Sequence, residues 1–227
     1  MDITSTWLVI AAYNEGAMIA DVIKSAVATM PNIVVVDDGS RDDTAMIACA
    51  AGATVIRHPV NLGQGAAIQT GIDFALREGA GIIVTFDADG QHRIEDAMLL
   101  ARAVDAGEAD VVCGSRFLGL ESVAMPAARR ATLRLAALFT RMSSGVPVTD
   151  AHNGLRALSR KAASCLRITQ NRMAHASEII AQIRPHNLRY KEYPVQIIYT
   201  EYSIAKGQKL SNAVNILIDL LFGRISK

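Results

Sequence analysis

Two carboxylates follow a predicted buried strand at a spacing that suits metal binding. Residues 82–86 (IIVTF) are rich in β-branched and aromatic side chains, and an Asp-Ala-Asp-Gly turn follows them directly. The side chains of Asp87 and Asp89 point the same way if the strand pitch continues through the turn, and Gln91 adds a neutral oxygen. Two close carboxylates repel each other unless a cation lies between them. Such ligands suit Mg²⁺ or Mn²⁺ held together with substrate phosphates, although two aspartates alone are also typical of a solvated turn.

Acidic residues also follow two other predicted strands. A strand over residues 7–11 leads to Glu15, and a strand over residues 33–36 leads to Asp37 and Asp38. The second strand is apolar throughout, which is typical of a parallel strand buried on both faces. Open sheets of parallel strands bind ligands outside their carboxyl ends. One crevice would therefore collect all three groups of acids.

Strands and helices alternate at short intervals in the first half of the chain. Further strands are predicted at residues 54–56 and 110–114. Helices are predicted at residues 17–29 and 94–106, and two more lie between them: one begins at residues 42–44, and the other follows residues 61–67 and ends at about residue 78. This alternation favours a three-layer α/β/α fold, Rossmann-like, with a mainly parallel central sheet.

The second half is less regular but shows no linker, repeat or low-complexity segment, so the whole chain is predicted to be a single domain. Its expected elements are a loop over residues 117–128, a basic amphipathic helix over 129–142, a short strand within 150–160, a helix over 174–183, a strand over 193–199 and a last helix.

Composition excludes several classes of protein. The 227 residues have a net charge of +1, which gives no general attraction to nucleic acid. The three cysteines are far apart and lack metal-site spacing, as expected in a reducing compartment. No signal peptide and no apolar run long enough to span a membrane is evident. We therefore expect a cytoplasmic protein.

Five successive motifs resemble those of the family-2 glycosyltransferases with the GT-A fold. They are residues 11–15 (AAYNE), 37–40 (DDGS), 61–67 (NLGQGAA), 87–92 (DADGQH) and 114–117 (GSRF). The closest branch is that of the dolichol-phosphate mannosyltransferases and bacterial polyprenyl-phosphate glycosyltransferases. Beyond these motifs, residues 150–157 are similar to the acceptor-side motif of the family, and Glu178 matches its helix glutamate.

The resemblance implies a metal-dependent, inverting transfer of a sugar from a UDP- or GDP-sugar. Residues 1–117 would form the nucleotide-sugar-binding half, residues 118–207 the acceptor-side half, and residues 208–227 a C-terminal amphipathic helix. Asp89 and Gln91 would hold Mg²⁺ or Mn²⁺ against the diphosphate.

The resemblance also implies a set of donor contacts. The residues expected to contact the nucleotide sugar are Ala12, Tyr13, Glu15, Asp37, Asp38, Gly65, Asp87, Ala88 and Arg116. Asp38 would hydrogen-bond the base, and Arg116 would stabilise charge on the departing nucleoside diphosphate. Helix capping by Glu15 and Asp38, and a surface ion pair of Arg116, are the alternatives.

The acceptor is less well specified. The family places an arginine after an aromatic-Pro pair to hold a lipid phosphate, and Arg129 matches it although Met125 replaces the aromatic residue. A polyprenyl phosphate is already ionised and needs no general base, whereas a hydroxyl acceptor on a glycan or glycolipid does. Asp150 and Glu178 are the candidate bases, with capping or pairing to nearby arginines as the alternative for each.

The last predicted helix starts at Gln208 and ends at Ile225. Its apolar arc is wider than packing on one protein face requires. This helix either packs in the core or contacts another surface. That surface would be the inner face of the membrane, a membrane partner subunit or a second copy in a homo-oligomer.

Two other functions remain open at this point. A nucleotidyltransferase on a similar sheet would show a Gly-rich, basic phosphate loop after the first strand, and residues 12–15 are not one. A catalytically silent nucleotide-binding scaffold would have no need for Asp87, Asp89, Gln91 and Arg116 together.

Overall fold

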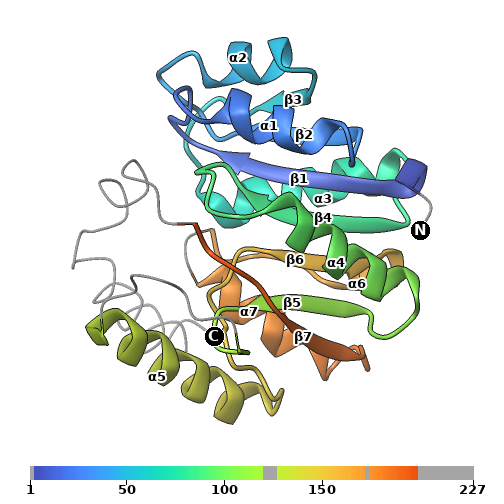
Figure 1. The fold of residues 1–227 in the computed structure, drawn as a ribbon, viewed down its shortest axis with the longest axis vertical. Coiled ribbons are helices and arrows are strands. Elements are labelled where there is room, and N and C mark those ends of the chain that lie inside the picture. Colours follow the sequence, from blue (N-terminus) through green and yellow to red (C-terminus); the bar gives the residue numbers. More distant parts are fainter. Residues whose placement is uncertain (1–2, 120–126, 172–173, 199–227) are drawn as a thin grey trace.

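A computed structural model describes residues 3–119, 127–171 and 174–198. They form a seven-stranded sheet with the strand order β3-β2-β1-β4-β6-β5-β7 (Figure 1). The strands are β1 (Thr6–Ala12), β2 (Asn32–Asp37), β3 (Thr54–Arg57), β4 (Ile82–Asp87), β5 (Val111–Ser115), β6 (Arg156–Ser159) and β7 (Tyr190–Pro194). Strand β6 pairs antiparallel with β4 and β5, and every other strand pairing is parallel. The predicted mainly parallel sheet is therefore confirmed.

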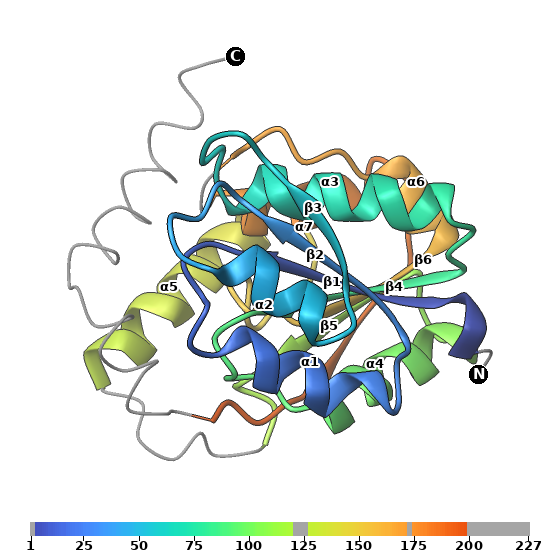
Figure 2. The same ribbon diagram turned by 90° about the horizontal axis from the view of Figure 1, so that it is seen from above.

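Helices cover both faces of this sheet, as Figure 2 shows. They are α1 (Ile19–Val27), α2 (Thr44–Ala50), α3 (Gln64–Arg77), α4 (Ile94–Asp105), α5 (Ala127–Ser144), α6 (Arg160–Cys165) and α7 (His175–Ile183), after a short 3-10 turn, η1 (Ile3–Ser5). Helices α1, α2 and α4 share one buried apolar cluster with the sheet, and α3, α6 and α7 share a second cluster on the other face. The central strands are apolar on both faces because both are covered.

Strand β7 lies three residues earlier than the sequence predicts. The predicted strand followed the apolar residues near Val195, but the alternating segment Tyr190–Pro194 pairs with the edge of the sheet instead. The apolar residues after it leave the sheet and cross the turn that follows β4, where Ile197 bridges His92 and the Ile198 N–H donates to the Gln91 carbonyl at 2.9 Å. This apolar segment thus packs on the turn that the sequence predicts to bind a metal.

Parts of the predicted acceptor side lie outside the described residues, namely Met125 and the last helix from Gln208 to Ile225. Within the described part of the chain, no helix combines the length and the apolarity needed to cross a membrane.

Helix α3 crosses β1 at a glycine. A Cβ atom on Gly71 would lie 2.3 Å from Cγ1 of Val9, so helix and strand approach more closely than any side chain allows. We expect Gly71→Ala to lower the free energy of unfolding by about 1–2 kcal/mol in urea titrations, because overpacking outweighs the higher helix propensity of alanine. An unchanged or raised stability would contradict this close approach.

Candidate active site

Three acid-bearing strand ends lie side by side at the carboxyl edge of the sheet. Strand β1 lies between β2 and β4, with Ala12 opposite Asp37 and Ala11 opposite Asp87. The chain turns at this edge after each strand, and the segment that enters β6 starts from the same edge because β6 runs in the opposite direction. The topology therefore brings residues 12–16, 37–44, 87–92 and 150–155 to one edge of the sheet.

Asp87 is enclosed by groups from three parts of the chain. One oxygen accepts a hydrogen bond from Nε2 of Gln64 at 3.2 Å, and the other lies 2.8 Å from Nε2 of His92. Gly154 packs directly on this carboxylate, since a Cβ there would lie 2.4 Å from an Asp87 oxygen. Burial alone would raise the pKa of Asp87, but the hydrogen bond and charge of His92, with the charges of His175 and Arg156, hold that pKa below its usual value.

Asp89 has the opposite electrostatics. Burial, followed by the charge of Asp87, raises the pKa of Asp89 to about 6, although the Gln91 N–H donates to this carboxylate at 3.0 Å. The two carboxylates thus repel each other across the turn. No group of three or more His, Cys, Asp or Glu side chains among the described residues could hold a metal ion. A metal bound by Asp89 and Gln91 would therefore need further ligands from a substrate.

The loop after β1 is fastened to the loop after β2. Backbone N–H groups of Asn14, Glu15 and Gly16 donate to side-chain oxygens of Ser40, Thr44 and Asp42 at 2.9–3.1 Å. Tyr13 is 39% exposed, which leaves its ring accessible to a ligand.

The side chains of Ala12 and Ala88, both expected to contact the nucleotide sugar, lie in the apolar core instead. Only their backbone groups could serve a ligand.

Asp37 and Asp38 both contact other residues of the protein through their carboxylates. Asp37 is fully buried, pairs with Arg57 at 3.1 Å and accepts the Ser40 N–H. Asp38 is 2% exposed, and its oxygens face the ring of His58 and the backbone N–H groups of Leu62 and Gly63 at 2.7–2.9 Å.

This carboxylate thus holds the loop that leads into α3, and its hydrogen bond to a base stays a prediction. Beside it lies a surface pocket of about 390 Å³, lined by Gly39, Ser40, Arg57, His58 and Pro59. The pocket offers a base-sized space that the sequence did not reveal.

Gly65 also differs from its predicted role. A Cβ on Gly65 would lie 2.1 Å from the carbonyl oxygen of Gln170 and 3.0 Å from Cβ of His175, and its N–H donates to the Asn171 carbonyl. This glycine is needed where the acceptor-side half packs on the start of α3, and it does not face an open site.

Arg116 and Asp150 form a buried ion pair. Two guanidinium nitrogens of Arg116 donate to the two oxygens of Asp150 at 2.6 Å each, and the Arg116 backbone N–H adds a third bond at 3.1 Å. Glu192 accepts the backbone N–H groups of Thr149 and Asp150 and so holds the same loop. The predicted separate roles, phosphate contact for Arg116 and general base for Asp150, are not what this conformation shows.

Glu178 is occupied as well. Its carboxylate accepts the backbone N–H groups of Thr169 and Gln170 at 3.0 and 2.9 Å and the Thr169 hydroxyl. It holds the loop that packs on Gly65, and its role as a base stays a prediction.

Several buried polar atoms near Asp87 lack a hydrogen-bond partner within the described residues. They are Nδ1 of His92, Nδ1 of His152, Nδ2 of Asn153 and Nε of Arg156. Burial lowers the pKa of His152 to about 4, so this ring is neutral near pH 7. These residues belong to two of the segments that resemble the family, 87–92 and 150–157, but the sequence did not show that they lie together. These atoms are candidate contacts for a polar substrate.

Comparison with known proteins gives consistent matches. Residues 7–167 match the family model described as Glycosyl transferase family 2. An uncharacterized protein of Methanocaldococcus jannaschii is 38% identical over 96% of this chain and 92% of its own length. A UDP-N-acetylglucosamine–dolichyl-phosphate N-acetylglucosaminyltransferase of Methanococcus voltae is 32% identical over 97% of this chain and 96% of its own length.

Among solved structures, a glucosyl-3-phosphoglycerate synthase of Mycobacterium tuberculosis aligns with a TM-score of 0.74 at 21% identity. The alignment covers 97% of this chain and 79% of that one. That structure contains Mn²⁺, uridine diphosphate and glucosyl-3-phosphoglycerate. The likeness confirms the predicted GT-A fold.

The Arg116–Asp150 pair predicts a pH-dependent stability. Burial raises the pKa of Asp150, but the charge and hydrogen bonds of Arg116 outweigh burial and hold that pKa below its usual value. The stabilisation is therefore present above about pH 4, the unfolded-state pKa, and is lost as the pH falls through the lower folded-state pKa. We expect Asp150→Asn to lose about 3–5 kcal/mol at pH 7, because it leaves the Arg116 charge buried without its partner.

Urea titrations from pH 7 to pH 3 check this. The variant should also lose less stability than the wild type on acidification. Asp73→Asn, which breaks an ion pair between half-exposed groups, is the matched control and should cost at most about 1 kcal/mol. Equal losses for the two variants would contradict the buried pair.

Proposed function

The chain belongs to glycosyl transferase family 2 and is a glycosyltransferase, and we propose that it transfers a sugar from a nucleoside-diphosphate sugar to a polyprenyl phosphate at a membrane surface. The donor would be a UDP- or GDP-sugar bound by residues 1–117, and the later residues would receive the acceptor. The relative from Methanococcus voltae, whose name gives a dolichyl-phosphate acceptor and a UDP-sugar donor, supports this assignment over nearly the whole chain.

One observation carries the choice of acceptor. A hydroxyl acceptor would need a general base, and the two candidates are Asp150 and Glu178. Each of these carboxylates accepts hydrogen bonds from several donors and holds part of the protein's own structure in place. A hydroxyl must lose a proton as it attacks, so it needs such a base, whereas a phosphate monoester is already ionised at neutral pH. A phosphate acceptor therefore fits the described site better than an alcohol.

The donor would lie across the ends of β1, β2 and β4. The exposed ring of Tyr13 and the pocket beside His58 and Arg57 are suited to the nucleoside, since one offers a stacking surface and the other polar groups around a base-sized space. The unpartnered donors of Asn153 and Arg156, beside Asp87, are suited to hydroxyl groups of the sugar.

The residues fit a divalent cation only together with the donor. Asp89 and Gln91 would hold Mg²⁺ or Mn²⁺. Burial and then the charge of Asp87 raise the pKa of Asp89, and a cation would relieve the repulsion between the two carboxylates. The described residues contain too few clustered ligand side chains for a closed metal site, so a cation there would share its ligands with a diphosphate. When bound, the cation neutralises charge on the departing nucleoside diphosphate.

The chemical step is a single displacement. A phosphate oxygen of the acceptor forms a bond to the anomeric carbon of the sugar, and the bond from that carbon to the diphosphate breaks with its electron pair leaving on the diphosphate. The configuration inverts, and no proton needs to move. Arg116 donates to Asp150 through Nε and one terminal nitrogen, so we assign it the positioning of the loop after β5 in the state described.

Asp89→Asn tests the metal site. This carboxylate is half-buried, and within the described part of the chain it accepts one hydrogen bond, from the Gln91 N–H, so the fold should survive its loss. We expect transfer to fall by on the order of 100-fold or more, because stabilisation of the leaving group is lost. Calorimetry should also show that Mn²⁺ no longer strengthens binding of the nucleoside diphosphate. Asp21→Asn, an exposed aspartate on α1, is the control and should behave as the wild type. Metal-enhanced binding that survives in Asp89→Asn would refute the site.

The acceptor is tested with labelled donor sugars. Polyprenyl phosphate of short chain length should be glycosylated, and polyprenyl alcohol and soluble glycans should not. The side chain of Arg129 lies outside the described part of the structure, but its place in the first turn of α5 matches the expected acceptor arginine. Arg129→Ala should therefore raise the KM for the lipid phosphate about tenfold, the scale of a lost charge-assisted hydrogen bond. Arg102→Ala on α4 is the matched control. Transfer to alcohols but not to the lipid phosphate would defeat the proposal.

A further inference from the structure

Helix α5 exposes an apolar stripe on the face that points away from the protein. Leu135, Leu138 and Met142 are 62%, 53% and 78% exposed, and their spacing of three and four residues places them on one side of the helix. We call these three residues the outer stripe. The opposite side carries the buried residues Leu133, Ala136, Ala137 and Thr140. A helix that covers only its own domain has one apolar face and a polar outer face, so α5 has an apolar face without a partner in the described structure.

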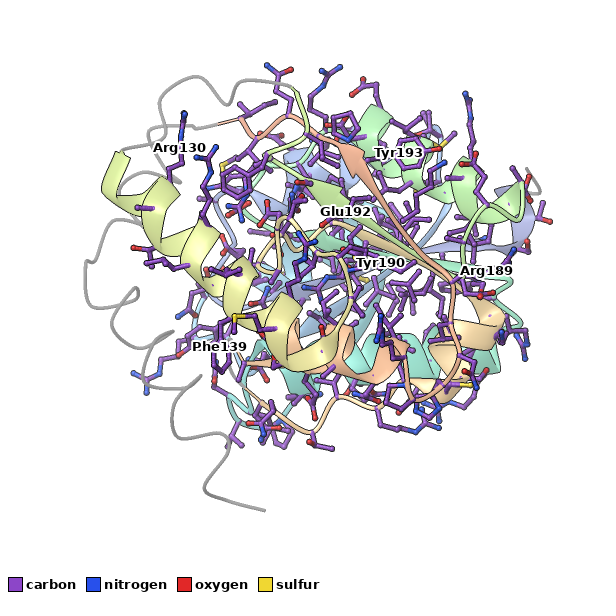
Figure 3. The ribbon with its side chains drawn as sticks, turned by 90° about the horizontal axis from the view of Figure 1, so that it is seen from below. Arg130, Phe139, Arg189, Tyr190, Glu192 and Tyr193 are labelled. Atoms are coloured by element: carbon purple, nitrogen blue, oxygen red, sulfur yellow. The ribbon has the colours of Figure 1, made fainter. Side chains whose placement is uncertain are left out.

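The charges of α5 are all of one sign. No aspartate or glutamate occurs from Ala127 to Ser144, whereas the helix has four arginines. Of these, Arg130, Arg134 and Arg141 are exposed, and their spacing of four and seven residues places them in one row. At 100° per residue this row lies between the outer stripe and the buried side. Figure 3 shows α5 at the margin of the molecule, with Arg130 near one end.

This combination fits one kind of partner. Helices that lie in a membrane interface have an apolar face beside a polar face rich in lysine and arginine. A second copy of α5 would bring two rows of arginines together, which like-charge repulsion disfavours. We propose that α5 docks the protein on an anionic lipid bilayer, with the outer stripe at the acyl boundary and the arginine row among the headgroups.

Contacts of α5 connect this surface to the site. The guanidinium of Arg134 lies 5.5 Å from the ring centre of Phe117, which follows the Arg116–Asp150 pair. The hydroxyl groups of Thr140 and Ser177 are 3.3 Å apart and join α5 to α7. In Figure 1, α5 lies on the side of the molecule toward which β1 points. Docking through α5 would hold the bilayer at the side of the molecule where the carboxyl edge lies. The purpose of this docking rests on the proposed lipid acceptor, but its physical basis does not.

Vesicle co-sedimentation of the full chain tests the surface. The wild type should sediment with vesicles of phosphatidylcholine and phosphatidylglycerol and much less with phosphatidylcholine alone. The triple variant Leu135→Ser, Leu138→Ser and Met142→Ser should bind anionic vesicles at least about tenfold more weakly, because three apolar side chains no longer leave water. Met46→Ser, which replaces a 65% exposed methionine on α2, is the matched control and should bind like the wild type.

A charge variant tests the second component. Arg141→Gln, at the end of α5 far from Arg129, should weaken binding to anionic vesicles about fivefold and leave binding to neutral vesicles unchanged. Arg102→Gln, an exposed arginine on α4, is its control. Circular dichroism of each variant establishes that the fold is intact.

The docking proposal would be overturned if the triple variant bound anionic vesicles as tightly as the wild type does. It would also be overturned if the wild-type protein bound neutral and anionic vesicles equally well. Transfer assays separate this outcome from the proposed function. The triple variant should glycosylate a detergent-dissolved short polyprenyl phosphate like the wild type, and lose transfer only to acceptor embedded in vesicles. Absence of transfer to any polyprenyl phosphate would refute the proposed function. It would not affect the docking proposal if vesicle binding still depended on α5.

Discussion

The partly buried carboxylate of Asp87, whose side chain is 30% exposed, is the constraint on which the arrangement of the site depends. It lies at the end of a central strand, where a charge removed from water must be matched by donors and opposite charge. Gln64 of α3 and His92 of the following turn supply the donors, and the charges of His175 and Arg156 supply the rest. Gly154 must be a glycine because any side chain would collide with this carboxylate. Stabilising one charge therefore fixes α3, α7, β6 and the turn after β4 relative to one another.

Other carboxylates at this edge form a second layer of support, and they bind backbone N–H groups of the protein. Asp38 holds the entrance to α3, Glu178 holds the loop that packs on Gly65, and Glu192 holds the loop that contains Asp150. Each of these carboxylates therefore holds a loop of the scaffold in place through its hydrogen bonds. Asp89 differs in that burial, followed by the charge of Asp87, raises its pKa to about 6.

Local patterns predicted most of the fold and the location of the site, but not the partners of its residues. Uniformly apolar runs such as Ile33–Val36 are found as buried parallel strands, and the acids after them meet at one edge. Arg116 and Asp150 are 34 residues apart, and Asp38 and Gly63 are 25 apart, so no sequence pattern could show that each is already occupied. Strand β7 was placed too late because an apolar run reads as a strand whether it joins a sheet or covers a turn. The pocket beside His58 arises from two loops and has no signature in either.

The antiparallel strand β6 also determines the order in which the sheet can be completed as the chain leaves the ribosome. The first four strands pair only with one another, apart from the outer edge of β4, so they can form a sheet once Asp87 has been made. Strand β5 pairs only with β6 and β7, and both come later in the chain. Its apolar residues stay without strand partners until Arg156 and the residues after it have been synthesised. Incomplete chains that end between β5 and β6 would expose that apolar edge, which makes this interval the stage of synthesis most open to aggregation or chaperone binding.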